Sequence, residues 1–129
     1  MVSPVFKNLL LVGLGSCLGG MARYIVSLLC QRSSWWALPW GTLTVNLVGC
    51  LFIGLLSGYA ERFGGMSVNL RMFLAVGFCG GFTTFSTFMN ENVGLIKADA
   101  SFSMLIYLAG SLVGGFLMVL AGYALMKIL

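Results

Sequence analysis

The sequence lacks histidine and has very few charged residues. Of its 129 residues, three are acidic and seven are basic, so that charged residues make up only 8% of the chain. The absence of histidine excludes imidazole-based proton relays and metal sites. The acids are Glu61, Glu91 and Asp99, which nearly excludes a paired-carboxylate catalytic centre. No nucleophile–base pair is recognisable either, and we therefore predict that the chain is not an enzyme.

The small number of charges also decides the class of protein. Hydrophobic residues make up 60% of the sequence, and a soluble domain of this size needs a polar surface that this composition cannot supply. The net charge of +4 is small, and the basic residues stand singly at the ends of apolar segments. They are typical of membrane-interface anchors and not of a nucleic-acid-binding patch. The composition predicts an integral membrane protein.

The four cysteines show no C-x-x-C spacing, and each lies in or at the end of an apolar run. This pattern predicts neither a disulfide framework nor a metal site. We interpret them as small apolar packing residues. They are Cys17, Cys30, Cys50 and Cys79.

Four apolar segments each exceed the roughly 20 residues that a helix needs to cross a bilayer. The first is too long for a typical signal-peptide core and ends at no clear cleavage site, so we expect it to be retained. With no linker or low-complexity tract, residues 1–129 are predicted to form one transmembrane domain of four helices. Their expected ranges are about 9–29, 41–59, 70–95 with a break near 80–83, and 102–126.

Each segment contains a Gly-x-x-x-Gly pair. This spacing places both glycines on one helix face and favours close packing of helix backbones. The pairs are Gly15 and Gly19, Gly54 and Gly58, Gly77 and Gly81, and Gly110 and Gly114.

The connection between the first two segments is polar and aromatic. Trp35, Trp36 and Trp40 stand close to Arg32, as in an interfacial aromatic belt. Pro39 is expected to end any preceding helix and to allow the next one to begin.

The third segment carries the most unusual stretch of the chain. Two adjacent glycines, Gly80 and Gly81, are followed by four hydroxyl side chains interleaved with phenylalanines over residues 82–88. Within a membrane, non-helical backbone is tolerated only where it is buried in protein or lines a water-filled cavity. A break here therefore predicts an ion or solute site. The alternative is that these small residues only help helices to pack.

The distribution of basic residues gives almost no preferred orientation in the membrane. Four crossings place both termini on one side, with four basic residues there and three on the other. Insertion in both orientations would permit an antiparallel homodimer with a two-fold axis in the membrane plane. A single orientation remains the alternative. The two groups are Lys7, Arg62, Arg71 and Lys127, and Arg23, Arg32 and Lys97.

Polar side chains within the second and fourth segments are candidates for a path through the membrane. Asn46 cannot be left unpaired in lipid, and Thr42 lies one turn away on the same face. Ser111 and Tyr107 have the same spacing in the fourth segment. These residues either line a path or form hydrogen bonds between helices, worth on the order of 1 kcal/mol each.

Phe85 and Phe88 lie three residues apart and hence on one helix face. Their ring edges are electropositive, so that rings together with amide and hydroxyl donors could form an uncharged lining for an anion. Such a lining suits conduction, because an ion must both bind and leave. Arg23 and Glu91 are the charges closest to the crossings, and each is either a group at the mouth of a path or an ordinary charge at a helix end.

Two motifs resemble a known family. The run Gly80-Gly81-Phe82-Thr83-Thr84-Phe85-Ser86-Thr87-Phe88, with Gly41-Thr42-Leu43-Thr44-Val45-Asn46-Leu47-Val48-Gly49 upstream, is similar to that of the Fluc (CrcB) fluoride channels. Arg23-Tyr24 after Gly19-Gly20 and Gly110-Ser111 also fit. The resemblance covers essentially the whole chain in length, number of helices and order of motifs.

The resemblance implies a dual-topology, antiparallel homodimer with two fluoride pores in the bacterial inner membrane. It also implies passive, highly selective fluoride export that protects the cell. By position, Asn46, Phe85, Phe88 and Ser111 would line the pore. The positions at the pore entrance and vestibules are Arg23, Thr42 and Glu91.

The resemblance further implies a structural sodium ion on the two-fold axis, held by the backbone carbonyls of Gly80 and Thr83 from both chains. A hard cation needs such oxygen ligands. This sequence departs from the family pattern in a short connection between the third and fourth segments. Gly115 stands where some relatives carry a hydroxyl, and Tyr107 occupies a variable position. The fourth-helix assignments are therefore weaker than those of Asn46, Phe85 and Phe88.

Two other functions compete with a fluoride channel. A small dual-topology, proton-coupled multidrug antiporter also has about four short helices, but its mechanism needs a carboxylate within the membrane, typically in the first helix. The first segment here contains no acid, and Glu91 lies near a segment end. A structural or assembly subunit would need no polar break.

Overall fold

The computed structural model describes residues 2–31 and 38–129. Four helical stretches in these ranges are long and apolar enough to cross a membrane, and they confirm the prediction of an all-helical membrane protein. Arg32, Trp35 and Trp36 of the predicted aromatic belt lie outside the described residues. The four stretches are Pro4–Cys30, Trp40–Arg62, Val68–Lys97 and Ser101–Ile128.

The helices extend beyond the apolar cores from which they were predicted, and at the starts of the first and third spans a serine side chain satisfies a free backbone amide. The Ser3 side chain accepts a hydrogen bond from the Phe6 amide, and Ser67 does the same for Leu70. The third span consists of four consecutive pieces. The elements are α1 Pro4–Cys30, α2 Trp40–Arg62, α3 Val68–Leu70, the π-helical η1 Arg71–Cys79, α4 Gly80–Phe82, α5 Phe85–Lys97 and α6 Ser101–Ile128.

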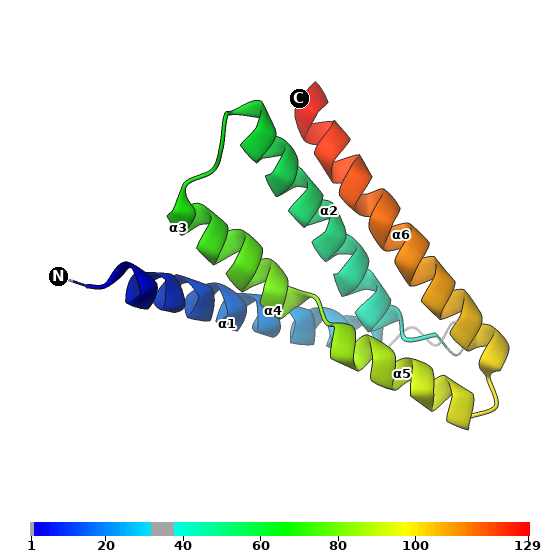
Figure 1. Cartoon of the computed structure of the whole chain (residues 1–129). Helices are drawn as coiled ribbons and strands as arrows, with labels where there is room; N and C mark the ends of the chain where they lie inside the picture. The colour runs from blue at the N-terminus through cyan, green and yellow to red at the C-terminus, as the bar shows by residue number, and fades with distance from the viewer. Residues whose placement is uncertain (1, 32–37) are drawn as a thin grey trace.

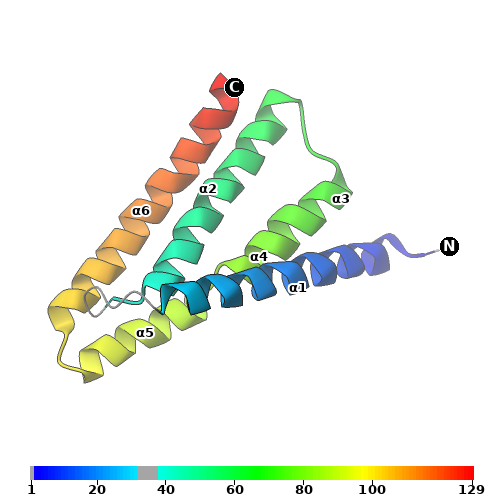
Figure 2. The same ribbon diagram turned by 180° about the vertical axis from the view of Figure 1, so that it is seen from behind.

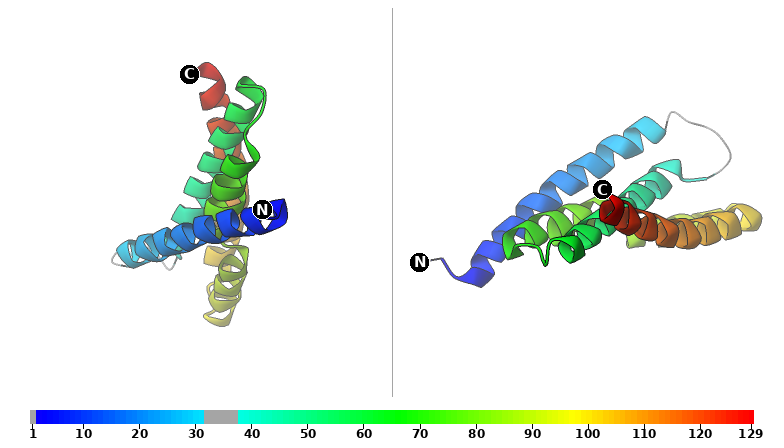
Figure 3. Two further views of the ribbon diagram at one scale, coloured as in Figure 1. Left: turned by 90° about the vertical axis from the view of Figure 1, so that its left-hand side faces the viewer. Right: turned by 90° about the horizontal axis from the view of Figure 1, so that it is seen from above.

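The spans associate as two pairs (Figure 1). Helix α2 packs along α6, and both run in the same direction, while α1 packs along η1 and α4. At the far end of the first pair, the Lys127 Nζ donates to Glu61 Oε1 at 2.9 Å and ties α6 to α2. Seen from behind, α1 lies in front of the third span (Figure 2). In the left view of Figure 3, α1 runs across the direction of the other helices.

Close packing within each pair depends on glycine. A Cβ atom added at Gly15 would lie 2.2 Å from the Phe73 carbonyl oxygen, and one added at Gly54 would lie 2.2 Å from the Val119 carbonyl oxygen. Such distances leave no room for a side chain, as expected for membrane helices in contact through small residues.

The predicted glycine pair of the fourth span, Gly110 and Gly114, does not bring two backbones together, since a Cβ at Gly114 would lie 3.0 Å from a side-chain atom, Leu47 Cδ2. A Cβ at Gly110 would meet nothing within 4 Å, whereas one at Gly122 would lie 2.2 Å from the Leu51 carbonyl oxygen. The reason is the position at which α6 meets α2: the two backbones come closest near the C-terminal half of α6, beyond the predicted pair.

The third span changes direction at Thr83 and Thr84. Both residues have extended backbone, with φ/ψ of −87°/159° and −151°/122°. Before this break the span packs along α1, and after it α5 packs against α6 (Figure 1). The packing of α5 buries Phe88, Leu95 and Tyr107 in one hydrophobic cluster. The break therefore joins the two helix pairs.

Candidate functional site

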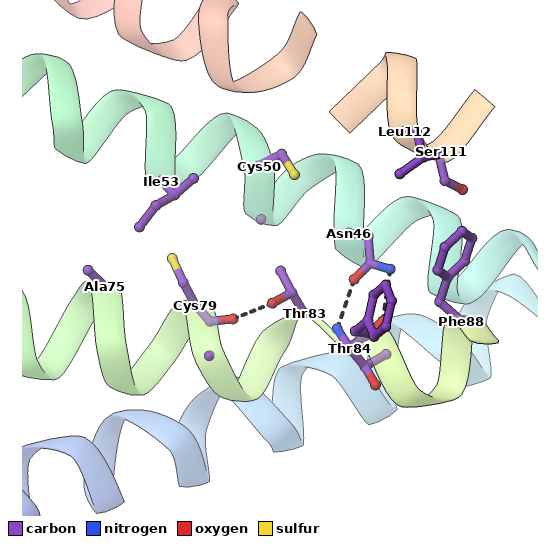
Figure 4. A pocket seen from close by; sticks show the side chains of 13 residues that line it. Asn46, Cys50, Ile53, Ala75, Cys79, Thr83, Thr84, Phe88, Ser111 and Leu112 are labelled. Atoms are coloured by element: carbon purple, nitrogen blue, oxygen red, sulfur yellow. Dashed lines mark hydrogen bonds between the residues drawn. The ribbon is translucent and has the colours of Figure 1, made fainter. Parts of the chain in front are cut away.

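The broken backbone is held by the side chain of Asn46 (Figure 4). Its Oδ1 accepts a hydrogen bond from the Thr84 amide at 2.8 Å, and its Nδ2 donates to the Thr84 carbonyl at 3.1 Å. One side-chain amide from α2 thus satisfies both polar groups of a residue that has left the helix. This is the interhelical hydrogen bond that the sequence allowed as one role of Asn46. It still leaves one N–H of the amide for another acceptor.

The same break frees carbonyl groups from the helical ladder. The Thr84 amide donates to Asn46, and the Thr87 amide donates to Thr84 Oγ1 at 3.4 Å. In an unbroken helix these two amides would bond the carbonyls of Gly80 and Thr83. Gly80 is exposed, and a Cβ added there would meet nothing within 4 Å. The carbonyls of Gly80 and Thr83, which were predicted to be cation ligands, therefore do not accept the backbone hydrogen bonds that a continuous helix would give them.

A cavity of about 450 Å³ adjoins the break, between α2, the third span and α6. It brings together the side chains of Asn46, Phe85, Phe88 and Ser111, which the sequence predicted to share a path. Figure 4 shows Asn46, Phe88 and Ser111 around it. None of the described residues that line it is charged. The full lining consists of Asn46, Gly49, Cys50, Ile53, Ala75, Cys79, Gly80, Thr83, Thr84, Phe85, Phe88, Ser111 and Leu112.

Two features of this lining suit a small anion. The Ser111 hydroxyl is buried and has no hydrogen-bond partner among the described residues, so that a donor is available inside the cavity. The Phe85 and Phe88 ring centroids lie 6.2 Å apart, with Phe88 only 4% exposed and Phe85 71% exposed. Phe88 also packs edge-to-face with Tyr107, which fixes its ring. Phe85 is left on an open face of the chain.

Thr42, Tyr107 and Glu91 form a separate cluster next to the cavity. The Thr42 hydroxyl donates to Glu91 Oε1 at 2.6 Å, and the Tyr107 hydroxyl donates to Oε2 at 2.7 Å. Thr42 is 6% exposed and Tyr107 is 1% exposed. Neither lines the cavity that contains Asn46. Their connection to it is the contact of Tyr107 with the Phe88 ring.

Arg23 faces a smaller hollow of about 250 Å³ on the other side of Thr84. Its Nε is buried without a hydrogen-bond partner among residues 2–31 and 38–129. The hydroxyls of Thr42, Thr84 and Thr87 line the same hollow. A cation surrounded by hydroxyl groups beside the break is consistent with a mouth for anions, as predicted for this position.

Cys50 and the Thr84 backbone belong to the site but were not predicted from the sequence to do so. Cys50 follows Asn46 by four residues, so its place on the same helix face could have been read from the spacing. The role of Thr84 could not, because it depends on a side chain from another span.

The fold and site define a multi-pass α-helical membrane protein with an interrupted span and, at the interruption, a mostly apolar cavity whose described lining includes Asn46 and Ser111 but no charged residue. The model of the CrcB-like protein, Camphor Resistance (CrcB) family matches residues 10–123, and the chain belongs to this family. Its relatives include proteins named fluoride-specific ion channel FluC. One from Chlorobium phaeobacteroides (strain DSM 266) is 45% identical over 119 residues, covering 92% of each chain. One from Azobacteroides pseudotrichonymphae genomovar. CFP2 is 39% identical over 121 residues, covering 94% of this chain and 97% of the relative.

Proposed function

We propose that this protein is a fluoride-selective channel that lets fluoride leave the bacterial cell passively. The observation that carries this proposal is the uncharged cavity in which Asn46, Ser111 and the two phenylalanines meet. The names of its relatives point to the same ion.

The chemistry of the lining explains how a strongly hydrated anion could cross. Water around fluoride must be replaced by donors, and the remaining N–H of Asn46 and the hydroxyl of Ser111 supply them. The edges of Phe85 and Phe88 add weak electropositive contacts. Because none of the described side chains that line the cavity is positively charged, no fixed cationic side chain traps an anion there, and binding remains weak enough for release.

Two pores formed by an antiparallel homodimer complete this proposal. Phe85 is 71% exposed although it lines the cavity, and Gly80 faces open space. A second, inverted copy seated on this face would cover both groups and close the cavity. The near balance of basic residues at the two ends of the spans allows the chain to insert in either orientation.

A structural sodium ion at the dimer centre also belongs to the proposal. Among the described residues, no group of three or more His, Cys, Asp or Glu side chains could hold a metal. The carbonyls of Gly80 and Thr83 fit a hard cation. The amides of Thr84 and Thr87, which would bond them in a continuous helix, donate to other acceptors. If each of two copies supplies these oxygens to one ion, the ion would hold the interrupted third spans of the two copies together. The Asn46, Phe85 and Ser111 side chains of this chain form the path itself.

The competing proton-coupled antiporter is not favoured by the site. Its carboxylate must be free to bind substrate and exchange protons, whereas both oxygens of Glu91, which lines a hollow beside Thr42, accept hydrogen bonds from the Thr42 and Tyr107 hydroxyls. The structure of α1 adds no acid to the first span.

Flux from liposomes tests the proposed function. Purified protein is reconstituted in vesicles loaded with equal fluoride and chloride, and each ion is followed with its own electrode after an ionophore shunts the membrane potential. We expect fluoride to leave rapidly and chloride to remain. Equal efflux of the two ions would refute fluoride selectivity.

The dimer and its cation are tested separately. Mass measurement of the protein in detergent should give a dimer, and a cysteine introduced at Lys127 in a cysteine-free background should be labelled from both sides of the membrane in intact cells. Replacing sodium by N-methyl-D-glucamine should lower the thermal stability of the dimer. A monomer, or labelling from one side only, contradicts the antiparallel assembly, and unchanged stability contradicts the cation.

A further inference from the structure

Cys50 lines the same cavity as Asn46 and Ser111 (Figure 4). It lies on α2 four residues after Asn46, and the two side chains therefore share one face of the helix. The thiol is partly buried and free, so that it takes part in no disulfide. None of the assignments above uses this group.

Gly115 on α6 lies against this thiol. A Cβ added at Gly115 would lie 3.3 Å from Cys50 Sγ, and Gly115 is itself buried. By contrast, a Cβ added at Gly54 or Gly122 of this helix pair would lie 2.2 Å from a backbone oxygen. The absence of a side chain at Gly115 thus makes room for one sulfur atom and is not needed to bring the backbones together.

Ser111 lies one turn before Gly115 on α6. The unpartnered Ser111 hydroxyl and the Cys50 thiol consequently occupy successive levels of one wall of the cavity. A thiol is a weak hydrogen-bond donor and a small apolar group, so it adds no charge to this wall.

We propose that Cys50 is a further residue of the ion path, that its thiol forms the wall one turn beyond Ser111, and that Gly115 provides the space for it. This inference rests on the proposed fluoride conduction and adds a residue to its path. It implies that a group added to the Cys50 thiol obstructs the passage of the ion. It also implies that a larger residue at position 115 slows the ion by displacing the Cys50 side chain.

Methyl methanethiolsulfonate provides a small neutral probe. The Cys50 thiol first gives its proton to the buffer, and the thiolate then attacks the sulfenyl sulfur of the reagent. A new S–S bond forms, the S–S bond of the reagent breaks, and methanesulfinate leaves with the electron pair. The thiol is converted to a methyl disulfide, which adds volume at the cavity wall.

The first experiment uses a protein in which Cys50 is the sole cysteine, made by C17A, C30A and C79A. Fluoride efflux is measured before and after the reagent, and mass spectrometry counts the adducts. A matched protein retains only Cys17, which is exposed on α1 away from the cavity. We expect the adduct on Cys50 to slow fluoride at least about tenfold, because the obstruction lies in the conducting wall. The Cys17 adduct should leave the rate of its own variant unchanged.

The outcomes separate this inference from the proposed function. If the unsubstituted protein passes fluoride and chloride equally, the proposed function fails. If fluoride flux is selective but unchanged once the Cys50 adduct is complete, the path residue is refuted. If Cys50 does not react under conditions that modify Cys17, the reagent is too large for a path that excludes chloride, and the Gly115 variants decide the inference.

A second pair of variants keeps the test independent of the reagent. G115A places a methyl group 3.3 Å from the sulfur, and we expect it to slow fluoride. C50A combined with G115A removes the sulfur and should recover most of the lost rate. If G115A is equally defective with and without Cys50, Gly115 serves another purpose and the inference is overturned.

Discussion

Asn46 and Thr84 are joined by two hydrogen bonds of 2.8 and 3.1 Å, although they lie 38 residues apart in the sequence. The Asn46 side-chain amide bonds both the N–H and the C=O of Thr84, whose backbone is not helical. The same contact diverts the Thr84 amide from Gly80 and so frees a carbonyl at the break. One side chain therefore stabilises an irregular backbone within the membrane and places a spare donor beside the cavity.

Replacing Asn46 by alanine should abolish fluoride flux and weaken the fold. Both polar groups of Thr84 lose their partner, and each unsatisfied buried group costs about 1–3 kcal/mol. Thermal unfolding in detergent and fluoride efflux from liposomes measure the two effects. Asn90→Ala on the exposed face of α5 is the control and should change neither. Normal flux in Asn46→Ala would show that the break does not need this amide.

The two phenylalanines should respond differently to replacement by isoleucine. Phe85 is 71% exposed, so Phe85→Ile should slow fluoride without lowering the stability of the chain. Phe88 is 4% exposed and packs against Tyr107, so Phe88→Ile should slow fluoride and also cost about 0.5–1.5 kcal/mol for the lost ring contact.

Phe116→Ile supplies the control for both variants, because Phe116 is 67% exposed on α6 and does not line the cavity. Fluoride efflux and thermal unfolding are compared for the three proteins. Unchanged flux in both Phe85→Ile and Phe88→Ile would remove the rings from the mechanism.

The carboxylate of Glu91 and the hydroxyl of Tyr107 should be energetically coupled. The Tyr107 hydroxyl donates to Glu91 Oε2 at 2.7 Å, and Tyr107 is 1% exposed. Glu91→Gln and Tyr107→Phe should each destabilise the protein, and the double variant should be more stable than the sum of the two losses predicts. The coupling expected for neighbours in one network is about 0.5–3 kcal/mol.

A double-mutant cycle by thermal or denaturant unfolding in detergent measures this coupling. Glu61→Gln with Tyr107→Phe is the matched pair, because Glu61 bonds Lys127 at the far end of α2 and should show no coupling to Tyr107. Additive losses for Glu91 and Tyr107 would mean that their contact contributes nothing to stability.

Features that depend on one segment could be predicted from the sequence, and features that depend on two could not. The four spans follow from the length of the apolar runs, and the interruption follows from Gly80 and Gly81. The extended residues are Thr83 and Thr84, just beyond the glycines, because the partner of the break is Asn46 on α2.

The same distinction applies to the polar residues. Ser111 and Tyr107 share a face of α6 by spacing alone, yet Ser111 lines the cavity while Tyr107 binds Glu91. Which of the two residues meets α5 depends on the angle at which α5 leaves the break. Likewise, Gly122 rather than Gly110 contacts α2, because the level of closest approach is a property of the helix pair.

Two glycines of α1 offer a sharp test of the packing between α1 and the third span. A Cβ at Gly15 would lie 2.2 Å from the Phe73 carbonyl oxygen, whereas a Cβ at Gly13 would meet nothing within 4 Å. Gly15→Ala must therefore push two backbones apart, and we expect a loss of about 1–3 kcal/mol from overpacking. Gly13→Ala should instead gain up to about 0.5–1 kcal/mol, because alanine loses less conformational entropy in a helix. Thermal unfolding of the two variants should give shifts of opposite sign. Equal shifts would mean that α1 is not seated on the third span as described, since the two sites differ mainly in what lies opposite the added methyl group.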